Sequence, residues 1–120
     1  IHPYYMWNAA KAGMPPASEA EYEAYLDSRV VFAQEKGKEL LASETVWGAV
    51  DDAQHVDVMR YTLGALKERG IGFIVHALQH SLVADLHYPT YGPVGWPEVL
   101  HFVNPDGSLR AGHEAFNDYC

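Results

Sequence analysis

Apolar side chains recur at helical spacing in two stretches of the chain. The first stretch begins after Ser18, which forms a capping-box pattern with Glu21, and Gly37 supplies a helix stop. The positions that recur there are Tyr22, Tyr25, Leu26, Arg29, Val30 and Ala33. The second stretch has a candidate N-cap at Asp51-Asp52 and ends at Arg69-Gly70. Its apolar positions are Val56, Met59, Leu63 and Leu66. The pattern therefore predicts two amphipathic helices of similar length.

Each predicted helix is followed by a short apolar run. Glu39 to Ser43 is apolar in its middle and Ile71 to Leu78 is almost continuously apolar, so both are predicted to be strands buried on both faces. His76, inside the second run, is expected to be a hydrogen-bonded core histidine. The order helix, strand, helix, strand indicates repeated β/α units and hence a parallel sheet.

The pattern changes after Leu78. Asp85 to Pro97 is rich in Pro, Gly, Tyr and Trp, and predicts a long loop whose side chains face a functional site. Asn104-Pro105-Asp106-Gly107 is a strong turn signal, and Ser108 to Tyr119 is predicted to form a closing helix. The acidic residues of the first helix are expected to form a solvated outer face; they are Glu19, Glu21, Glu23 and Asp27.

Glu44 closes the first apolar run. Active sites of α/β barrels lie at the C-terminal ends of the parallel strands, so a charge that closes a buried strand indicates chemistry. The alternative is that Glu44 has a structural role, as a carboxylate that caps the next turn or pairs with an arginine. The chain has 120 residues and begins at Ile1 without an initiator methionine. A whole barrel needs roughly 250 residues, so we expect a piece of a longer protein.

The composition disfavours some classes of binding partner. The net charge of -8, without a basic stripe, disfavours nucleic acid, and the sequence has no apolar run long enough to span a bilayer. Cys120 is the only cysteine, so an internal disulfide and a CxxC motif are both excluded. No cofactor is expected, and localisation and oligomeric state stay open.

Two short motifs resemble those of a known family, the retaining glycoside hydrolases of clan A with a (β/α)8 barrel, and most nearly the cellulase- and mannanase-like family 5. Ser43-Glu44-Thr45-Val46-Trp47-Gly48 resembles the motif of the nucleophile at the end of strand seven, and His2-Pro3-Tyr4 resembles the His-x-Tyr that ends strand six. The resemblance implies that residues 1–120 are the C-terminal portion of a single TIM-barrel catalytic domain, from the end of strand six to the closing helix. It implies Glu44 as nucleophile, supported by Tyr4 and His2, and an oligo- or polysaccharide with β linkages as substrate.

The chain departs from this family in two ways. The family's acid/base glutamate, after an asparagine at the end of strand four, has no counterpart here, so the isolated fragment should be inactive. The family also carries a tryptophan at the end of strand eight, which stacks under the sugar. The corresponding stretch here is Leu78-Gln79-His80-Ser81, which has no tryptophan. The candidates for the lost sugar-binding platform are Trp47, Trp96 and Trp7, with His80 as a donor to a sugar hydroxyl.

Two other classes of function compete with the hydrolase. His76 and His80, with Asp85 and His87, suggest a metal-dependent barrel hydrolase, although neither an HxH pair nor an HExxH helix is present. The chain could also be an intact small α/β module that binds a sugar or a protein. Two strands would leave that module with unpaired edges, so it would need to oligomerise.

Overall fold

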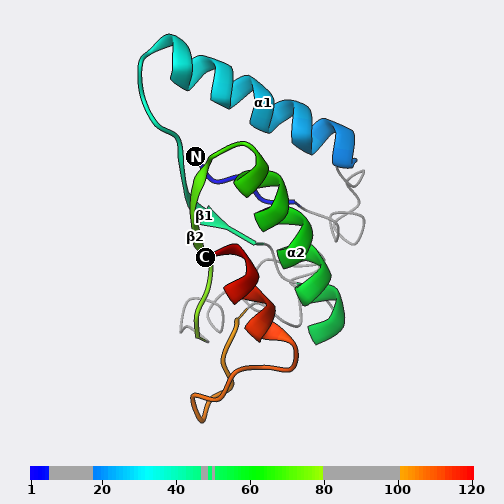
Figure 1. Cartoon of the computed structure of the whole chain (residues 1–120). Helices are drawn as coiled ribbons and strands as arrows, with labels where there is room; N and C mark the ends of the chain where they lie inside the picture. The colour runs from blue at the N-terminus through cyan, green and yellow to red at the C-terminus, as the bar shows by residue number, and fades with distance from the viewer. Residues whose placement is uncertain (6–17, 47–48, 50, 80–100) are drawn as a thin grey trace, which may run out of the picture.

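The computed structural model describes residues 1–5, 18–46, 49, 51–79 and 101–120 (Figure 1). Its elements are helix α1 (Glu19–Glu35), strand β1 (Leu41–Thr45), helix α2 (Asp52–Glu68), strand β2 (Gly72–Val75) and a 3-10 helix, η2 (His113–Tyr119). The two strands pair in parallel. The predicted order and the parallel pairing are therefore confirmed, and the described part of the chain is a small mixed α/β domain.

Local capping signals explain where the two α-helices begin and end. Ser18 Oγ accepts from the Glu21 backbone N–H at 3.1 Å, and the Glu21 carboxylate accepts from the Ser18 N–H at 2.9 Å. Asp51 caps α2 by accepting from the Gln54 N–H at 2.9 Å. Beyond each C-terminus a glycine adopts a positive φ, 61° at Gly37 and 66° at Gly70, which other residues rarely adopt. The predicted helix boundaries are confirmed.

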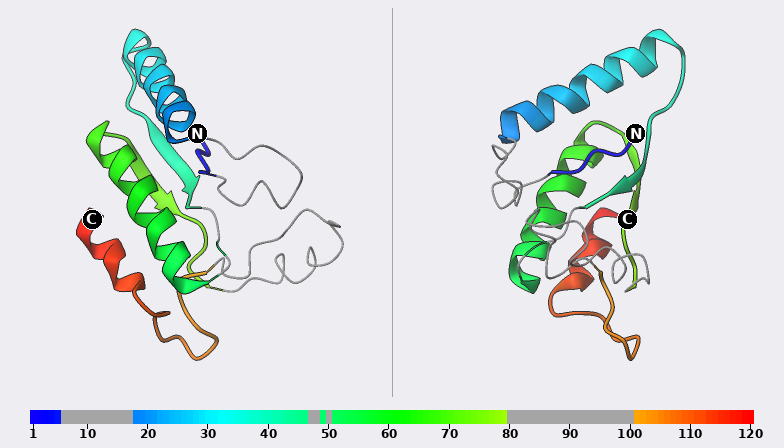
Figure 2. Two further views of the ribbon diagram at one scale, coloured as in Figure 1. Left: turned by 90° about the vertical axis from the view of Figure 1, so that its right-hand side faces the viewer. Right: turned by 180° about the vertical axis from the view of Figure 1, so that it is seen from behind.

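The prediction of strands buried on both faces is wrong. β1 starts at Leu41 and includes Glu44, and β2 ends at Val75, three residues before the predicted end. Leu41 is 49% exposed and Ile74 is 56% exposed. The reason is that the described helices lie to one side of the sheet (Figures 1 and 2), so none of them covers its other face. We call this second side the open face.

His76 does not lie in the core. Its side chain is exposed, because it follows the end of β2 and does not sit in the middle of a buried strand. The peptide bond between His76 and Ala77 is cis.

The N-terminal residues extend the sheet beside β1. The Ile1 nitrogen donates to the Leu41 carbonyl at 2.8 Å, and the Ser43 N–H donates to the Ile1 carbonyl at 3.0 Å. This alternation on either side of Ala42 is the hydrogen-bond pattern of parallel pairing. The Pro3 carbonyl then accepts from two buried hydroxyls, Thr45 at 2.9 Å and Tyr22 at 3.0 Å. Three parallel segments thus follow in the order N-terminal residues, β1, β2.

The core lies between the sheet and the helices. Fully buried side chains from the helices meet there; they are Leu26, Met59, Leu63 and Leu66. The acidic side of α1 is only partly a solvated face. The Arg69 side chain bonds Asp27 at 2.6 Å and Glu23 at 3.2 Å, so these two carboxylates tie α1 to the end of α2.

The closing helix is shorter than predicted. The turn at Asn104-Pro105-Asp106-Gly107 is confirmed by the bond from the Gly107 N–H to the Asn104 carbonyl at 2.9 Å. Leu109 then pairs with Val103 in an antiparallel bridge, and Gly112 has φ 76°. A residue with that φ cannot continue a right-handed helix, so η2 begins only at His113. Among the described residues, neither α1 nor α2 contains a stretch apolar and long enough to cross a membrane.

Candidate functional site

Glu44 lies near the C-terminal end of β1, where an irregularity changes the direction of its side chain. Ala42 pairs with Phe73 and Thr45 with Val75, so Ser43 and Glu44 together lie opposite Ile74. Two residues opposite one constitute a β-bulge, a feature found often beside active sites because it re-aims a side chain. Ala42 and Thr45 are both buried, while the Glu44 side chain is 43% exposed. The bulge therefore brings Glu44 to the open face while Thr45 stays in the core.

The N-terminal segment supplies the partners of Glu44. The Tyr4 hydroxyl donates to Glu44 Oε2 at 2.7 Å, and His2 Nδ1 lies 3.6 Å from the same oxygen. His2 Nε2 lies 3.1 Å from the Ser43 hydroxyl. The structure thus brings together His2, Tyr4 and Glu44, three residues that the sequence analysis singled out, although they lie about 40 positions apart.

These contacts favour an ionised carboxylate next to a protonated phenol. The hydrogen bond from Tyr4 holds the pKa of Glu44 below its usual value of 4.5; partial desolvation opposes this, and the positive charges available to His2 and His76 add to it. Burial raises the pKa of Tyr4 well above its usual 10.0, and the bond to Glu44 raises it further. A carboxylate that is charged and directed at neutral pH is chemically suited to nucleophilic attack.

The backbone after Glu44 is strained. Val46 is 1% exposed and has a φ of 65°. Such a φ is a real outlier for a β-branched residue and costs about 1–3 kcal/mol. Strain of this kind persists where the surrounding structure imposes it, and it gathers at functional sites. Here it lies directly after the end of β1, two residues from Glu44.

Sequence reasoning placed His76 in the core and missed that its backbone lies beside the end of β1. The residue follows β2 directly, and its N–H donates to the Thr45 carbonyl at 2.9 Å, one residue from Glu44. A positive charge on His76 would add to the effects that lower the pKa of Glu44, after the hydrogen bond from Tyr4 and the charge of His2. A strand predicted to end at Val75 would have placed His76 at the same edge of the sheet as the end of β1.

The proposed sugar-binding residues lie outside the described residues. These are Trp7, Trp47, His80 and Trp96, and the predicted loop from Asp85 to Pro97 lies outside them as well. Within the described ranges, no group of three or more His, Cys, Asp or Glu side chains could hold a metal ion.

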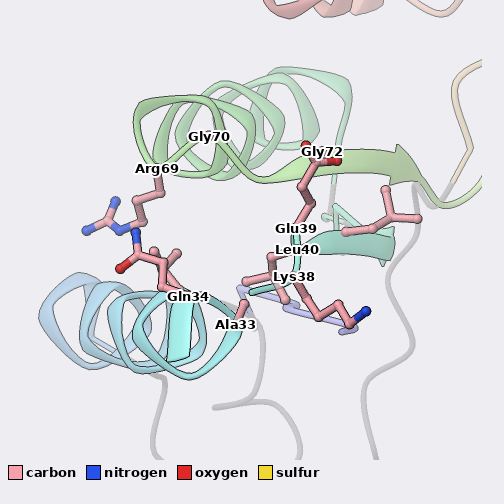
Figure 3. Close-up of a pocket in the computed structure, with 10 residues that line it drawn as sticks. Ala33, Gln34, Lys38, Glu39, Leu40, Arg69, Gly70 and Gly72 are labelled. Atoms are coloured by element: carbon pink, nitrogen blue, oxygen red, sulfur yellow. The ribbon is translucent and has the colours of Figure 1, made fainter. Parts of the chain in front are cut away.

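Two hollows adjoin the described elements. One, of about 270 Å³, lies between the N-terminal segment and α1; it is lined by His2 and Tyr4 on one side and by Tyr22 and Tyr25 on the other. The other, of about 540 Å³, lies at the opposite end of the sheet, where α1 and α2 both end (Figure 3). Gln34, Lys38 and Arg69 line it, and the Arg69 charge is already paired with two carboxylates. This larger hollow lies at the N-terminal ends of β1 and β2, away from Glu44.

Comparisons of the chain with protein-family models, with curated proteins and with solved structures find no match.

Proposed function

We propose that the chain is the C-terminal part of a (β/α)8 glycoside hydrolase that cleaves a β-linked glycan with retention, and that Glu44 is its nucleophile. The observation that carries this proposal is the 2.7 Å hydrogen bond from Tyr4 to Glu44. A tyrosine from one parallel segment donating to a carboxylate at the C-terminal end of the next is what the resemblance to clan A implies for a nucleophile and its support.

The architecture around the bond also supports a barrel. Three parallel segments follow one another in chain order, as neighbouring strands of a barrel do. The helices lie on one side of the sheet, and the other side exposes apolar residues such as Leu41 and Ile74. In a complete barrel, that second side would face the packed interior, and further strands would cover it.

In a retaining mechanism, the Glu44 carboxylate attacks the anomeric carbon as the bond to the leaving oxygen breaks, which gives a covalent glycosyl-enzyme. Tyr4 holds the attacking oxygen in position through its short hydrogen bond. The acid/base carboxyl, about 5–5.5 Å from the nucleophile in retaining enzymes, protonates the leaving oxygen and then activates the water. The proposal assigns that group to an upstream part of the protein.

The test uses the full-length protein that carries this chain. It is incubated with a 2-deoxy-2-fluoro β-glycoside that has an activated leaving group, because departure of such a group needs little acid assistance. Peptide mass spectrometry should find the fluorosugar on Glu44. The Glu44→Gln variant should carry no label, and its activity on aryl β-glycosides should fall by orders of magnitude.

Glu39→Gln is the matched control, since Glu39 is an exposed glutamate before β1 at the other end of the sheet. This variant should be labelled on Glu44 by the fluorosugar, and should hydrolyse aryl β-glycosides, at the same rates as the wild type. A fluorosugar on another residue, or full activity in Glu44→Gln, would show that Glu44 has a structural role only.

A further inference from the structure

The hydroxyl of Ser43 lies next to Glu44 on the open face. Along β1, Leu41 and Ser43 are exposed and Ala42 between them is buried, so the Ser43 side chain points away from the core. The bulge places Ser43 and Glu44 together opposite one residue of β2. Ser43 Oγ lies 3.1 Å from Nε2 of His2. An exposed hydroxyl with one defined partner therefore adjoins the proposed nucleophile.

The Glu44 carboxylate determines which nitrogen of the neutral His2 ring carries the proton. His2 Nδ1 lies 3.6 Å from Glu44 Oε2, and an ionised carboxylate can only accept hydrogen bonds. Its negative charge attracts an N–H and repels a nitrogen lone pair, so the proton belongs on Nδ1 and Nε2 is bare. A bare Nε2 can only accept, so the Ser43 hydroxyl donates to it.

This direction of hydrogen bonding limits what Ser43 can offer to a ligand. A hydroxyl has one proton and two acceptor lone pairs. The Ser43 hydroxyl gives its proton to His2, and the Ser43 backbone N–H already donates to the Ile1 carbonyl at 3.0 Å. The side chain therefore presents only lone pairs to the open face, where a donor such as a sugar hydroxyl can meet them.

We propose that Ser43 is a substrate-binding residue, which accepts a hydrogen bond from one hydroxyl of the sugar ring that Glu44 attacks. His2 is its positioning residue, because the imidazole takes the Ser43 proton and turns the lone pairs outward. The proposal rests on the proposed function for the identity of the ligand. It separates the two supports of Glu44, since Tyr4 orients the carboxylate alone, whereas His2 also sets the polarity of the neighbouring hydroxyl.

The kinetic test compares the full-length wild type with Ser43→Ala on an aryl β-glycoside and on analogues in which one hydroxyl of the attacked ring is replaced by hydrogen or fluorine. Comparing the two proteins on each substrate cancels the intrinsic reactivity of that substrate. The loss of kcat/KM caused by Ser43→Ala should be roughly three- to tenfold larger on the parent glycoside than on the analogue altered at the contacted position. Fluorine cannot donate a hydrogen bond, so it should behave like hydrogen there.

Two variants serve as controls for this comparison. Ser43→Thr keeps the hydroxyl and should keep the wild-type discrimination between the parent glycoside and its analogues. Ser28→Ala removes another exposed hydroxyl, which donates to the Tyr25 carbonyl at 2.6 Å on α1, and should match the wild type on every substrate. Amide spectra verify that each variant is folded. If Ser43→Ala lowers kcat/KM by the same factor on the parent and on all analogues, Ser43 does not contact a sugar hydroxyl and the proposal is wrong.

Imidazole ¹⁵N NMR tests the role of His2 without substrate. At a pH where the ring is neutral, Nδ1 should carry the proton, and the Nε2 resonance should shift in Ser43→Ala because its hydrogen bond is lost. A proton on Nε2 would make Ser43 the acceptor and leave its own proton for the ligand, which overturns the proposal even if the fluorosugar labels Glu44. Labelling of another residue, with His2 as expected, would instead overturn the assignment of Glu44 as nucleophile.

Discussion

Acidification should weaken the fold through one buried side chain, His55. The residue is fully buried in α2, and its Nδ1 lies 2.7 Å from Nε2 of His113, which is also buried. His113 Nδ1 lies 3.0 Å from the Ala111 carbonyl, which can only accept a hydrogen bond. His113 therefore carries its proton on Nδ1, and its bare Nε2 accepts from His55 Nδ1–H. This leaves His55 Nε2 unprotonated, and it is buried with no partner among the described residues.

A second proton on His55 would have to go to that buried nitrogen. Burial, with added repulsion from His113 and Arg110, lowers the pKa of His55 from 6.5 to about 3. At a pH between these two pKa values, His55 binds a proton in the unfolded chain but not in the folded chain. Stability is therefore lost as the pH falls below 6.5. One proton changes the free energy of unfolding by about 1.4 kcal/mol per pH unit, so the loss by pH 5 is roughly 2 kcal/mol.

Urea unfolding at pH 7, 6 and 5 measures this loss, with His55→Gln as the comparison. The glutamine can still hydrogen-bond to His113 but does not titrate, so the variant should lose about 2 kcal/mol less than the wild type between pH 7 and pH 5. ¹⁵N NMR of the imidazole gives the same answer without a variant, since His55 should stay neutral at pH 5. Equal losses in both proteins, or a charged His55 at pH 5, would refute the reasoning.

Three further single substitutions have predictable effects. Tyr4→Phe removes a hydrogen bond to a charged group, worth about 1.5–3 kcal/mol, so labelling of Glu44 by the fluorosugar should slow by roughly ten- to a hundredfold in rate measurements. Gly64→Ala should stabilise α2 by about 0.5–1 kcal/mol, because a Cβ there meets nothing closer than 3.9 Å from Tyr119. Gly70→Ala should destabilise by about 1–2 kcal/mol, since φ is 66° although the space is open. Thermal unfolding that shifts in the same direction for both glycine variants would contradict this.

Local signals in the sequence predicted the helices well. The capping box at Ser18 and the stops at Gly37 and Gly70 depend on residues within one turn of each other, so they act the same way in any surroundings. The turn before Ser108 is of the same kind. Helix order and parallel pairing followed from these boundaries.

The strands and the site depended on contacts that no local pattern contains. Whether both faces of β1 are buried depends on what packs on them, and apolar content alone predicted burial of Leu41, which is wrong. The pairing of His55 with His113 joins residues 58 positions apart and was not foreseen. Tyr4 and Glu44 were connected in advance only through resemblance to a family, because neither residue's neighbours specify the other.

The bulge in β1 has a consequence for anyone who edits this sequence. Because Ser43 and Glu44 share the space opposite Ile74, the strand is one residue longer than a regular ladder requires. Deleting Ser43 would restore strict alternation, with Glu44 alone opposite Ile74 and still on the open face between the buried Ala42 and Thr45, while Thr45 kept its pairing with Val75. Inserting a residue before Ala42 would instead move the whole strand out of step with Ile1. The register of β1 is therefore fixed at both ends, and the extra residue between them lets Ser43 and Glu44 lie side by side outside the core.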